Sequence, residues 1–482
     1  MKKMSKIIIS LIVALVLISL ITQYHGHSDI ADYTNVAKFF AGSYSAKLRT
    51  SHSITYGLFN FPLVYLFQSI FIMKITSLIW MLLIILSVYY ISNKNKRTLL
   101  LLVLSPIVWY MAPWISPIQL ASLFFLWAFY FIDKFDQTQD NKSLIYSGLL
   151  VGLAAVFWNT MIFLCFFLII CFFYNRNVNH LVVFLLSFLI GLIPLFIVDC
   201  VFYGPPFYSM MKFFFGVVAT SLYGSIYSGI VQMSRSFTSY ITFILILPFF
   251  GYLLFNKKIF NKNKRHTIFL SLSFLFFFLS NPQIRYILIL WAPLILILSK
   301  NLTKEQFKKQ IILFSIITFL VVIPYAIQIK YSTNSPDFSN MVANLGKEQI
   351  FCYDQEEMIA ADLQEIISKY PNSVFVVGNE PDSYSVLAEI YLGNEVQEFV
   401  SIQDYELWMS NQSSLFQKKF IFTPKIADRR QIWIAGGMEK SLNDQTDYES
   451  IDLAISIDET LDLEDFELIK DYEILHLYSR NI

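Results

Sequence analysis

Charged residues are scarce in this sequence: they make up 15% of its 482 residues, whereas hydrophobic residues make up 56%. A soluble globular domain normally has about 25% charged residues, so the composition excludes an ordinary soluble protein. Aromatic residues reach 17%, with 47 Phe. This composition is typical of an integral membrane protein, for which we expect membrane lipid and no nucleic acid as a partner.

Cysteine is also scarce, and the usual catalytic signatures are missing. Cys165, Cys171 and Cys200 lie in or at the end of apolar stretches, and Cys352 stands alone in the polar C-terminal third, so no disulfide framework is available. That third has no Gly-rich phosphate loop, no metal-ligand cluster and no nucleophile elbow. Its sequence therefore identifies no catalytic site there.

Long apolar stretches fill the first 330 residues. They lie at 6–23, 74–92, 98–112, 115–132, 143–157, 159–174, 180–202, 237–255, 267–280, 286–299 and 310–328. A crossing needs about 20 helical residues, so we expect about eleven spans. Several stretches are shorter than 17 residues, so the spans expected there include tilted pairs, broken helices or partial crossings. The first stretch follows a basic start and has no small-residue cleavage pattern after it, which favours a retained span over a signal peptide.

Acidic residues are unevenly distributed between two parts of the chain. Residues 1–336 contain 26 Lys and Arg but 7 Asp and Glu, whereas residues 337–482 contain 10 and 28. We therefore expect a multi-span transmembrane module at 1–334 and an acidic soluble domain at 335–482. The fold class is a polytopic α-helical membrane protein with a C-terminal soluble domain.

Helical and β-rich patterns alternate in the C-terminal part. The helical patterns lie at Asp354–Tyr370, Asp382–Leu392 and Asp404–Trp408. The β-rich runs lie at Val374–Val377, Phe420–Phe422 and Ile432–Ile434. This alternation predicts a small α/β domain.

Basic residues predict the orientation, because Lys and Arg accumulate in short cytoplasmic loops. With the N-terminus in the cytoplasm, the basic clusters all fall in cytoplasmic loops; they lie at 93–97, 175–177, 256–265 and 300–309. An odd number of spans then places the C-terminal domain outside the cell membrane. Two long outer loops, 24–73 and 203–236, lie on the same side.

Both long outer loops have helical patterns. Apolar residues recur at helical spacing from Asp29 to Phe40, and residues 57–73 are apolar but come too soon to be a separate crossing. We expect two helices there that lie along the membrane surface. In the second loop, Phe207 to Ile230 indicates another interfacial helix.

Carboxylates are rare on the predicted outer face of the membrane module, where only Asp29, Asp32 and Asp199 fall. Asp29 and Asp32 are three residues apart, on one face of a helix, at the membrane surface where a general base for an acceptor is needed. The alternative is that Asp29 caps the helix and Asp32 is a solvated first-turn residue. Asp199 ends an apolar stretch and either has a structural partner or serves a functional site.

Several outer cations are candidates for binding phosphate. Arg285 lies in a short turn between two apolar stretches, at the level of a phosphate headgroup, and arginine suits bidentate phosphate contact. Its alternative role is to anchor the next span. Arg49 and His52 belong to a polar cluster that suits phosphate or sugar hydroxyls, or a solvated turn. Arg235 is another outer cation.

The sequence identifies no cofactor, and it leaves open whether the protein binds a divalent metal. His25 and His27, with Asp29, have the right ligand types, but no third firm ligand is visible. Residues of the outer turns are candidates for a substrate pocket; these are Trp114, Asn159, Tyr203, Gln283 and Tyr286. Aromatic residues at such positions also simply mark the membrane interface.

The pattern resembles the GT-C superfamily of membrane glycosyltransferases, which use polyprenyl-phosphate-linked sugars. The similarity lies in the acidic loop after the first span (Asp29–Tyr33), the Gly152–Ala154 run in a middle span, the Pro282–Tyr286 turn and the outer soluble domain. Over most of residues 1–330, the similarity is one of topology, that is, of the order of spans and loops. The chain departs from the family where its carboxylates are three apart and where Trp158 and Asn159 stand near an expected Lys.

The resemblance implies an inverting transfer of a hexosyl or pentosyl group to a glycan, lipid or protein acceptor on the extracytoplasmic face. Asp29 or Asp32 would be the base, and Arg285 would stabilise the departing phosphate, with help from Arg49, His52 or Arg235. A chain with many spans is also compatible with two other functions: a transporter or flippase for lipid-linked saccharides, and a non-catalytic membrane scaffold.

Overall fold

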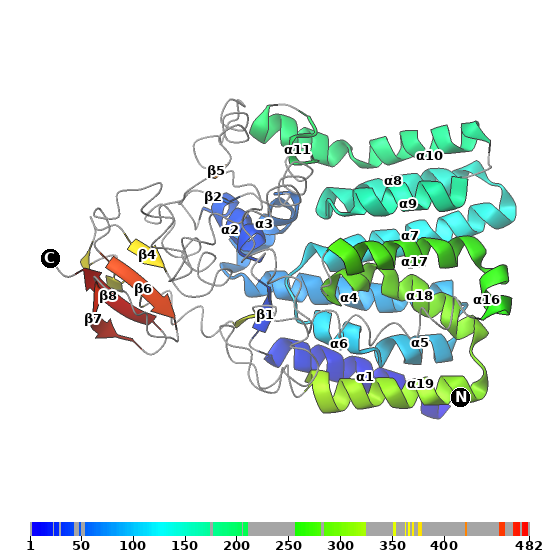
Figure 1. The fold of residues 1–482 in the computed structure, drawn as a ribbon, viewed down its shortest axis with the longest axis horizontal. Coiled ribbons are helices and arrows are strands. Elements are labelled where there is room, and N and C mark those ends of the chain that lie inside the picture. The colour runs from blue at the N-terminus through cyan, green and yellow to red at the C-terminus, as the bar shows by residue number, and fades with distance from the viewer. Residues whose placement is uncertain are drawn as a thin grey trace.

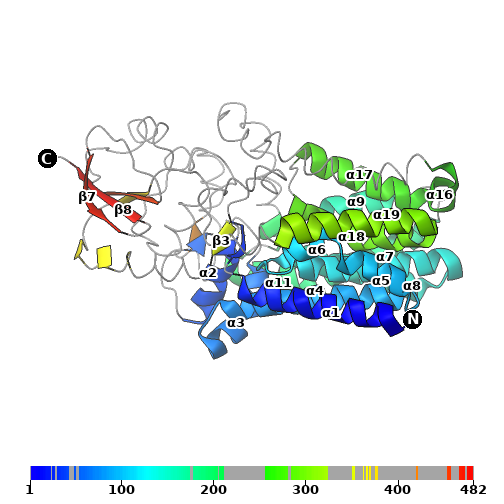
Figure 2. The same ribbon diagram turned by 90° about the horizontal axis from the view of Figure 1, so that it is seen from below.

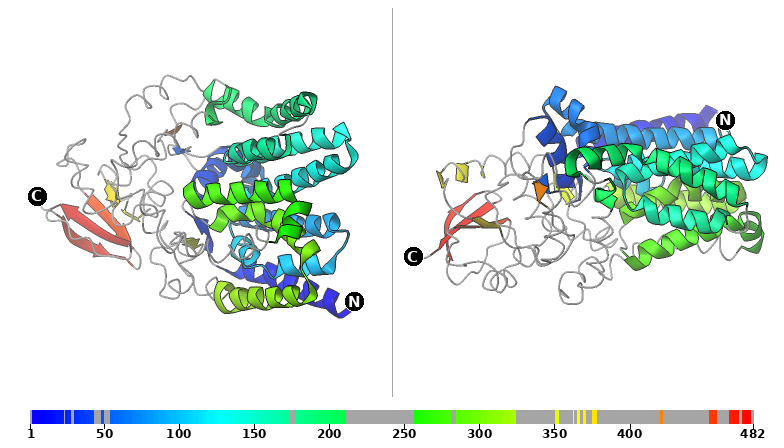
Figure 3. Two further views of the ribbon diagram at one scale, coloured as in Figure 1. Left: turned by 45° about the vertical axis from the view of Figure 1, so that its right-hand side comes forward. Right: turned by 90° about the horizontal axis from the view of Figure 1, so that it is seen from above.

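The computed structural model describes most of the first 323 residues and short segments of the remainder. The described residues are 2–22, 24–27, 30–42, 48–49, 54–173, 177–204, 206–210, 256–280, 284–323, 350–352, 362, 365–366, 369–370, 375–377, 420–421, 453–457, 466–472 and 475–480. Long helices run side by side in one bundle, and the C-terminal strands gather beyond one end of it (Figure 1). Views from below, from above and from an oblique angle agree (Figures 2 and 3).

The apolar stretches form most of the bundle helices, whereas α16 is formed by the basic segment 257–262 and the stretch 237–255 lies outside the described residues. The bundle helices are α1 (Lys2–Ile21), α4 (Phe71–Ile91), α5 (Lys96–Val103), α6 (Pro106–Met111), α7 (Pro117–Thr138), α8 (Asn141–Phe157), α9 (Met161–Phe173), α10 (Val178–Gly191), α11 (Ile193–Tyr203), α16 (Lys257–Lys262), α17 (Lys264–Ser280), α18 (Leu288–Asn301) and α19 (Lys304–Ile317). A π-helical turn, η3 (Thr318–Val322), continues α19.

The bundle is that of a membrane protein. Among the described residues, three helices are long and apolar enough to cross a membrane: α1, α4 and α7. Helices α10 and α11 pass the same test together, as a broken span bent by 42°. The predicted total of about eleven spans, from the length that a crossing needs, stays a prediction.

Two stretches that were predicted as single spans are each divided in two. The stretch at 98–112 consists of α5 and α6, and Ser105 between them is extended, with ψ at 129°. The stretch at 180–202 breaks between α10 and α11. A proline stands just after each break, Pro106 and Pro194. Proline lacks an amide proton and removes a helical hydrogen bond, so these two stretches are broken helices, one of the forms expected for some of the spans.

The first long loop contains two helices, as predicted. Helix α2 (Ile30–Phe40) matches the predicted helix. Helix α3 (Thr55–Phe67) ends earlier than the predicted 57–73, because Gln68 adopts a left-handed conformation with φ at 51°. Both helices lie at the end of the bundle nearest the strands (Figures 1 and 2).

Helices α8 and α10 pack in backbone contact. A Cβ atom on Gly152 would clash with the carbonyl oxygen of Phe188, and one on Gly191 would clash with that of Leu149. Small residues that let two backbones approach are typical of membrane helix pairs. Gly152, part of the run that carried the family resemblance, thus has a packing role in this chain.

We name the two ends of the bundle after the orientation that the sequence predicts. At one end, Lys96 donates to Ser5 (2.6 Å) and Thr98 donates to Ser299 (2.9 Å), joining α1, α5 and α18. The N-terminus and α16 lie at this end (Figure 1), and we call it the inner end. The outer end holds the last turns of α1 and α8, the first turns of α7, α9 and α18, and helices α2 and α3.

The C-terminal part contains a four-stranded sheet in the order β4-β6-β8-β7. Its strands are β4 (Phe375–Val377), β6 (Leu453–Ile457), β7 (Phe466–Asp471) and β8 (Leu475–Arg480). Strand β4 pairs parallel with β6, and the other two pairs are antiparallel. β4 falls in a predicted run, whereas the sequence reasoning missed β6, β7 and β8.

The predicted helices of this part are only partly covered by the described residues. Residues 362, 365, 366 and 369 of the predicted helix 354–370 are helical. The predicted helices 382–392 and 404–408 and the predicted strand 432–434 lie outside the described residues.

Two further strand pairs join the first long loop to the C-terminal part. Strand β1 (Tyr24–His27) pairs antiparallel with β3 (Ile350–Cys352). Strand β2 (Leu48–Arg49) pairs parallel with β5 (Phe420–Ile421). Because β1 directly follows the outer end of α1, the two parts of the chain meet at the outer end of the bundle.

Candidate active site

Arg285 is a buried cation at the outer end. It lies in η2 (Ile284–Ile287), a 3-10 turn between α17 and α18, and is 4% exposed. Its Nη2 donates to the phenol oxygen of Tyr286 at 3.1 Å, and its guanidinium carbon lies 5.0 Å from the centre of that ring. Both contacts hold the guanidinium in one orientation. A side chain that only anchors a span would be expected to reach the surface, so burial argues against that alternative. The phosphate-binding role stays a prediction.

Three aromatic rings lie against one another beside Arg285. The rings of Trp158, Phe277 and Tyr286 have pairwise centroid distances of 5.6 to 6.0 Å and interplanar angles of 20° to 22°. Trp158 belongs to the turn between α8 and α9, and Phe277 to the last turns of α17. The aromatic cluster thus fixes the position of η2 relative to three helices.

Gln119 is a buried polar residue that the sequence reasoning missed. Its Nε2 donates to the carbonyl oxygens of Met111 (2.8 Å) and Trp114 (3.1 Å), which holds the chain between α6 and α7. Helix α6 in turn contacts η2. A glutamine inside the apolar stretch 115–132 was the available signal, because a buried amide needs partners.

Three buried polar atoms near the outer end have no hydrogen-bond partner among the described residues. They are Oε1 of Gln119, Nε1 of Trp114 and Oδ1 of Asn159. Native proteins satisfy most such atoms with protein groups, water or a ligand. A donor and two acceptors of this kind suit the hydroxyl groups of a sugar.

Lys74 is a second buried cation and lies near the start of α4, 1% exposed. Its Nζ donates to the carbonyl oxygen of Thr22 at 2.5 Å and lies 3.5 Å from the hydroxyl of the same residue. Thr22 directly follows α1. Lys74 therefore fixes the point at which the first long loop leaves the bundle.

Close backbone packing anchors α2, the helix that carries Asp32. A Cβ atom on Gly57 of α3 would lie 2.6 Å from the Cβ of Val36 and 2.7 Å from the carbonyl oxygen of Tyr33. Only glycine allows this approach. Tyr33 also meets the ring of Tyr56 edge-on at 5.4 Å.

Helix α3 is in turn tied to α4 and α7. The hydroxyl groups of Tyr56 and Ser77 lie 2.8 Å apart, and the backbone amide of Ser116 donates to the same serine at 3.4 Å. Thr76 donates to Oδ1 of Asn60 at 3.0 Å. The backbone of Asp32 is thus part of a layer that is fixed to the outer end of the bundle.

Some predicted site residues are placed by their backbone only, and others fall outside the described residues. Asp32 lies in the first turn of α2, His25 and His27 lie in β1, Arg49 lies in β2, and Tyr203 is the last residue of α11. Asp29, His52, Arg235 and Gln283 lie outside the described residues. The roles predicted for both groups stay predictions. Arg285, Tyr286, Trp114 and Asn159 all lie at the outer end, where Tyr286 contacts both Arg285 and Trp158, the neighbour of Asn159.

Asp199 has the structural partner that was one of its two predicted roles. It is completely buried in α11. Ser209 donates to its carboxylate from the backbone amide at 3.0 Å and from the hydroxyl at 2.5 Å. The carboxylate therefore fixes the chain that follows α11, where Gly204 has φ at 90°.

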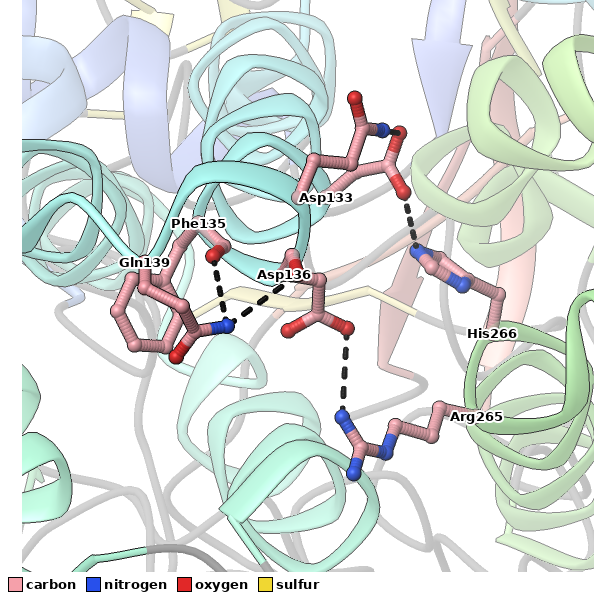
Figure 4. A network of polar contacts seen from close by, with 7 residues as sticks. Asp133, Phe135, Asp136, Gln139, Arg265 and His266 are labelled. Atoms are coloured by element: carbon pink, nitrogen blue, oxygen red, sulfur yellow. Dashed lines mark hydrogen bonds and ion pairs between the residues drawn. The ribbon is translucent and has the colours of Figure 1, made fainter.

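A polar network at the inner end links α7 to α17 (Figure 4). Asp133 lies 3.5 Å from Nε2 of His266, and Asp136 lies 3.4 Å from Nη1 of Arg265. The His266 ring also meets Phe129 edge-on at 4.8 Å. These carboxylates are a whole helix length from Arg285, so the network fastens two helices and is separate from the outer site.

Metal binding finds no support in the described part of the chain. No group of three or more His, Cys, Asp and Glu side chains that could hold an ion occurs among the described residues. The side chains of His25 and His27 are not among those described, so the weak metal prediction on this pair stays untested.

Solved structures of one other protein share the architecture. No protein-family model and no curated protein matches the sequence. Two crystal structures of ArnT from Cupriavidus metallidurans are similar, the apo state with a TM-score of 0.52 and the state bound to undecaprenyl phosphate with 0.50. Each has 11% sequence identity and covers 98% of this chain and 97% of ArnT. The expected GT-C resemblance is confirmed as a resemblance of fold.

Proposed function

We propose that this chain, a membrane protein with the fold of the GT-C glycosyltransferase ArnT, transfers a sugar from a polyprenyl-phosphate donor to an acceptor outside the cytoplasm. The observation that carries the proposal is Arg285, a buried guanidinium held at the end of the bundle where α2 brings Asp32. A fixed cation suits the phosphate of a lipid-linked donor, and a carboxylate at the same end suits an acceptor hydroxyl.

The reaction is a single displacement at the anomeric carbon. A carboxylate, that of Asp29 or Asp32, takes the proton of the acceptor hydroxyl, whose oxygen forms the new glycosidic bond. The bond between the anomeric carbon and the phosphate oxygen breaks, and its electrons leave with the polyprenyl phosphate. One displacement inverts the anomeric configuration. The acceptor is a glycan, a lipid or a protein.

Arg285 stabilises the charge that develops on the departing phosphate. Its orientation is already set by Tyr286, so little reorganisation is needed as that charge appears. Arg49, His52 and Arg235 are further candidates for the same phosphate. Trp114, Gln119 and Asn159 supply partners for sugar hydroxyls, and Tyr203 and Gln283 are further candidates for the pocket.

The orientation of the protein follows from its charges. The inner end, with Lys96, Arg265 and Lys300, faces the cytoplasm of the cell, where basic loops collect. The outer end and the C-terminal domain then face the extracytoplasmic space. A donor lipid in the outer leaflet would present its phosphate at the level of Arg285.

Purified protein in lipid nanodiscs tests the proposal. Supplied with polyprenyl phosphates that carry a hexose or a pentose and with candidate acceptors, it is expected to release free polyprenyl phosphate and form a glycosidic product. In sealed vesicles, movement of intact donor across the bilayer without cleavage would instead identify a flippase. Donor that is neither cleaved nor moved under any of these conditions would contradict an enzymatic role.

A further inference from the structure

The segment that carries both candidate bases is held at each end by the C-terminal part of the chain. In the sequence, Asp29 is the second residue after β1, and Asp32 lies in α2, between β1 and β2. Strand β1 pairs with β3, with Tyr24 opposite Cys352, Gly26 opposite Phe351 and His27 opposite Ile350, so that β1 has one extra residue between Tyr24 and Gly26. Strand β2 pairs with β5.

These pairs consist of backbone hydrogen bonds between segments that are far apart in sequence. Each pair forms a sheet of two strands. Closing such long loops costs entropy, so a pairing of this kind forms only where the rest of the fold brings the strands together. Backbone pairing also needs no particular side-chain charge. This is compatible with a C-terminal part that has 28 acidic and 10 basic residues and no catalytic motif.

We propose that the C-terminal domain is a positioning element for the reaction: through β3 and β5 it holds β1 and β2, the strands on either side of α2, so that the base meets the acceptor hydroxyl. This inference rests on the proposed function. The bundle side is already fixed, because Gly57 anchors α2 on α3 and Lys74 anchors Thr22. The two strand pairs fix the remaining freedom of the segment. A misplacement of about 1 Å costs on the order of 100-fold in rate, so this restraint matters for turnover.

The register suggests a cross-link that tests whether the pairing exists in the active protein. Tyr24 pairs directly with Cys352, and paired residues of antiparallel strands have Cα atoms about 4.5 to 5.5 Å apart, within the range of a disulfide. Tyr24→Cys is expected to form a disulfide between positions 24 and 352 on mild oxidation, identified by mass spectrometry of the linked peptides. The oxidised protein is expected to keep its kcat within twofold.

Two controls accompany the cross-link. Tyr24→Cys combined with Cys352→Ser has no cysteine at the paired position and is expected to give no such link. Adding Ile350→Cys to that double variant moves the cysteine two residues out of register and is expected to link far more slowly. Absence of a link in Tyr24→Cys, or a link that abolishes turnover, would overturn the proposed pairing in the active state.

Proline substitutions in β3 test positioning. Alternate amides of an antiparallel strand face the partner strand, so one of Phe351→Pro and Cys352→Pro removes a ladder donor and the other serves as its matched control. The disruptive variant is expected to lower kcat 10-fold or more and to leave the Kd of polyprenyl phosphate within twofold. Unchanged kcat in both variants would overturn the positioning role. The expected loss of activity in Asp29→Asn or in Asp32→Asn does not depend on this outcome, so the proposed function and the positioning role can fail separately.

Discussion

Trp158 lies nearly parallel to Tyr286, with ring centroids 5.6 Å apart, and Tyr286 accepts the hydrogen bond of Arg285. The turn between α8 and α9 thereby supports the guanidinium that we assign to the donor phosphate. Substitutions of Arg285 test the role of its charge, and substitution of Tyr286 tests the role of its orientation.

Arg285→Ala is expected to lower kcat by about 100-fold or more, the usual loss when one group that stabilises a developing anion is removed. Arg285→Lys should recover only part of this, because an ammonium group lacks the planar fork. Tyr286→Phe keeps the ring and removes one hydrogen bond, so a loss of about 2- to 10-fold is expected. Steady-state kinetics with a polyprenyl-phosphate sugar measures all three. Wild-type activity in all three variants would show that Arg285 has no role in the reaction.

Gly57→Ala is expected to move α2. Its new methyl group would overlap Val36 and the backbone of Tyr33, and overpacking of this kind costs about 1 to 3 kcal/mol. Because the strain falls on the helix that carries Asp32, kcat should fall more than the affinity for donor. Gly152→Ala is the matched control, since it strains α8 and α10 instead and should lower the melting temperature while the folded protein keeps its kcat.

Trp114→Phe tests the indole Nε1 as a partner of the substrate. This atom has no hydrogen-bond partner among the described residues, so no hydrogen bond of the described fold is lost. The side chain is 1% exposed, so the smaller ring leaves a cavity and should lower the melting temperature, and KM is therefore measured on the folded protein. If the atom binds a sugar hydroxyl, KM for the donor rises about 2- to 10-fold, the worth of one hydrogen bond. Gln119→Met, by contrast, leaves the carbonyl groups of Met111 and Trp114 without their donor and should destabilise the fold by about 1 to 3 kcal/mol. A KM that is unchanged in Trp114→Phe would exclude the indole from the pocket.

The inner network should affect stability and not chemistry. Asp136→Arg places like charges against Arg265, and the double variant with Arg265→Asp restores an opposite pair. The side chains are 20% and 42% exposed, so the coupling is expected to be about 1 kcal/mol or less. Thermal unfolding of the single and double variants measures it, and kcat/KM should stay within twofold. A large kinetic effect would mean that α17 transmits changes from the inner end to Arg285.

Local patterns predicted the helices better than their breaks or their partners. Helix α2 follows from apolar residues at helical spacing, and α7 from one apolar stretch. The division between α5 and α6 depends on Pro106, whose effect a hydropathy pattern does not register. Strand β7 was missed because Glu467, Lys470 and Asp471 interrupt the expected apolar run; pairing with β8 supplies its stability.

Non-local contacts escaped prediction for a physical reason. The burial of Lys74 and the pairing of β1 with β3 depend on residues far away in sequence, which no local pattern encodes. Gly152 was assigned to the family resemblance, and the structure adds its contact with α10. The scarcity of carboxylates and the place of Arg285 predict a site at the outer end, and this stays a prediction, whereas Gln119 could be recognised only from its contacts.

The general base is the centre of the proposed mechanism, and two conservative substitutions test it. Asp29→Asn and Asp32→Asn keep the size of each side chain and remove its basicity. Single-turnover transfer from a polyprenyl-phosphate sugar, measured on purified variants with donor binding checked separately, is expected to fall at least 100-fold in one variant while its donor Kd stays within a few fold. Full transfer activity in both variants would contradict the assignment.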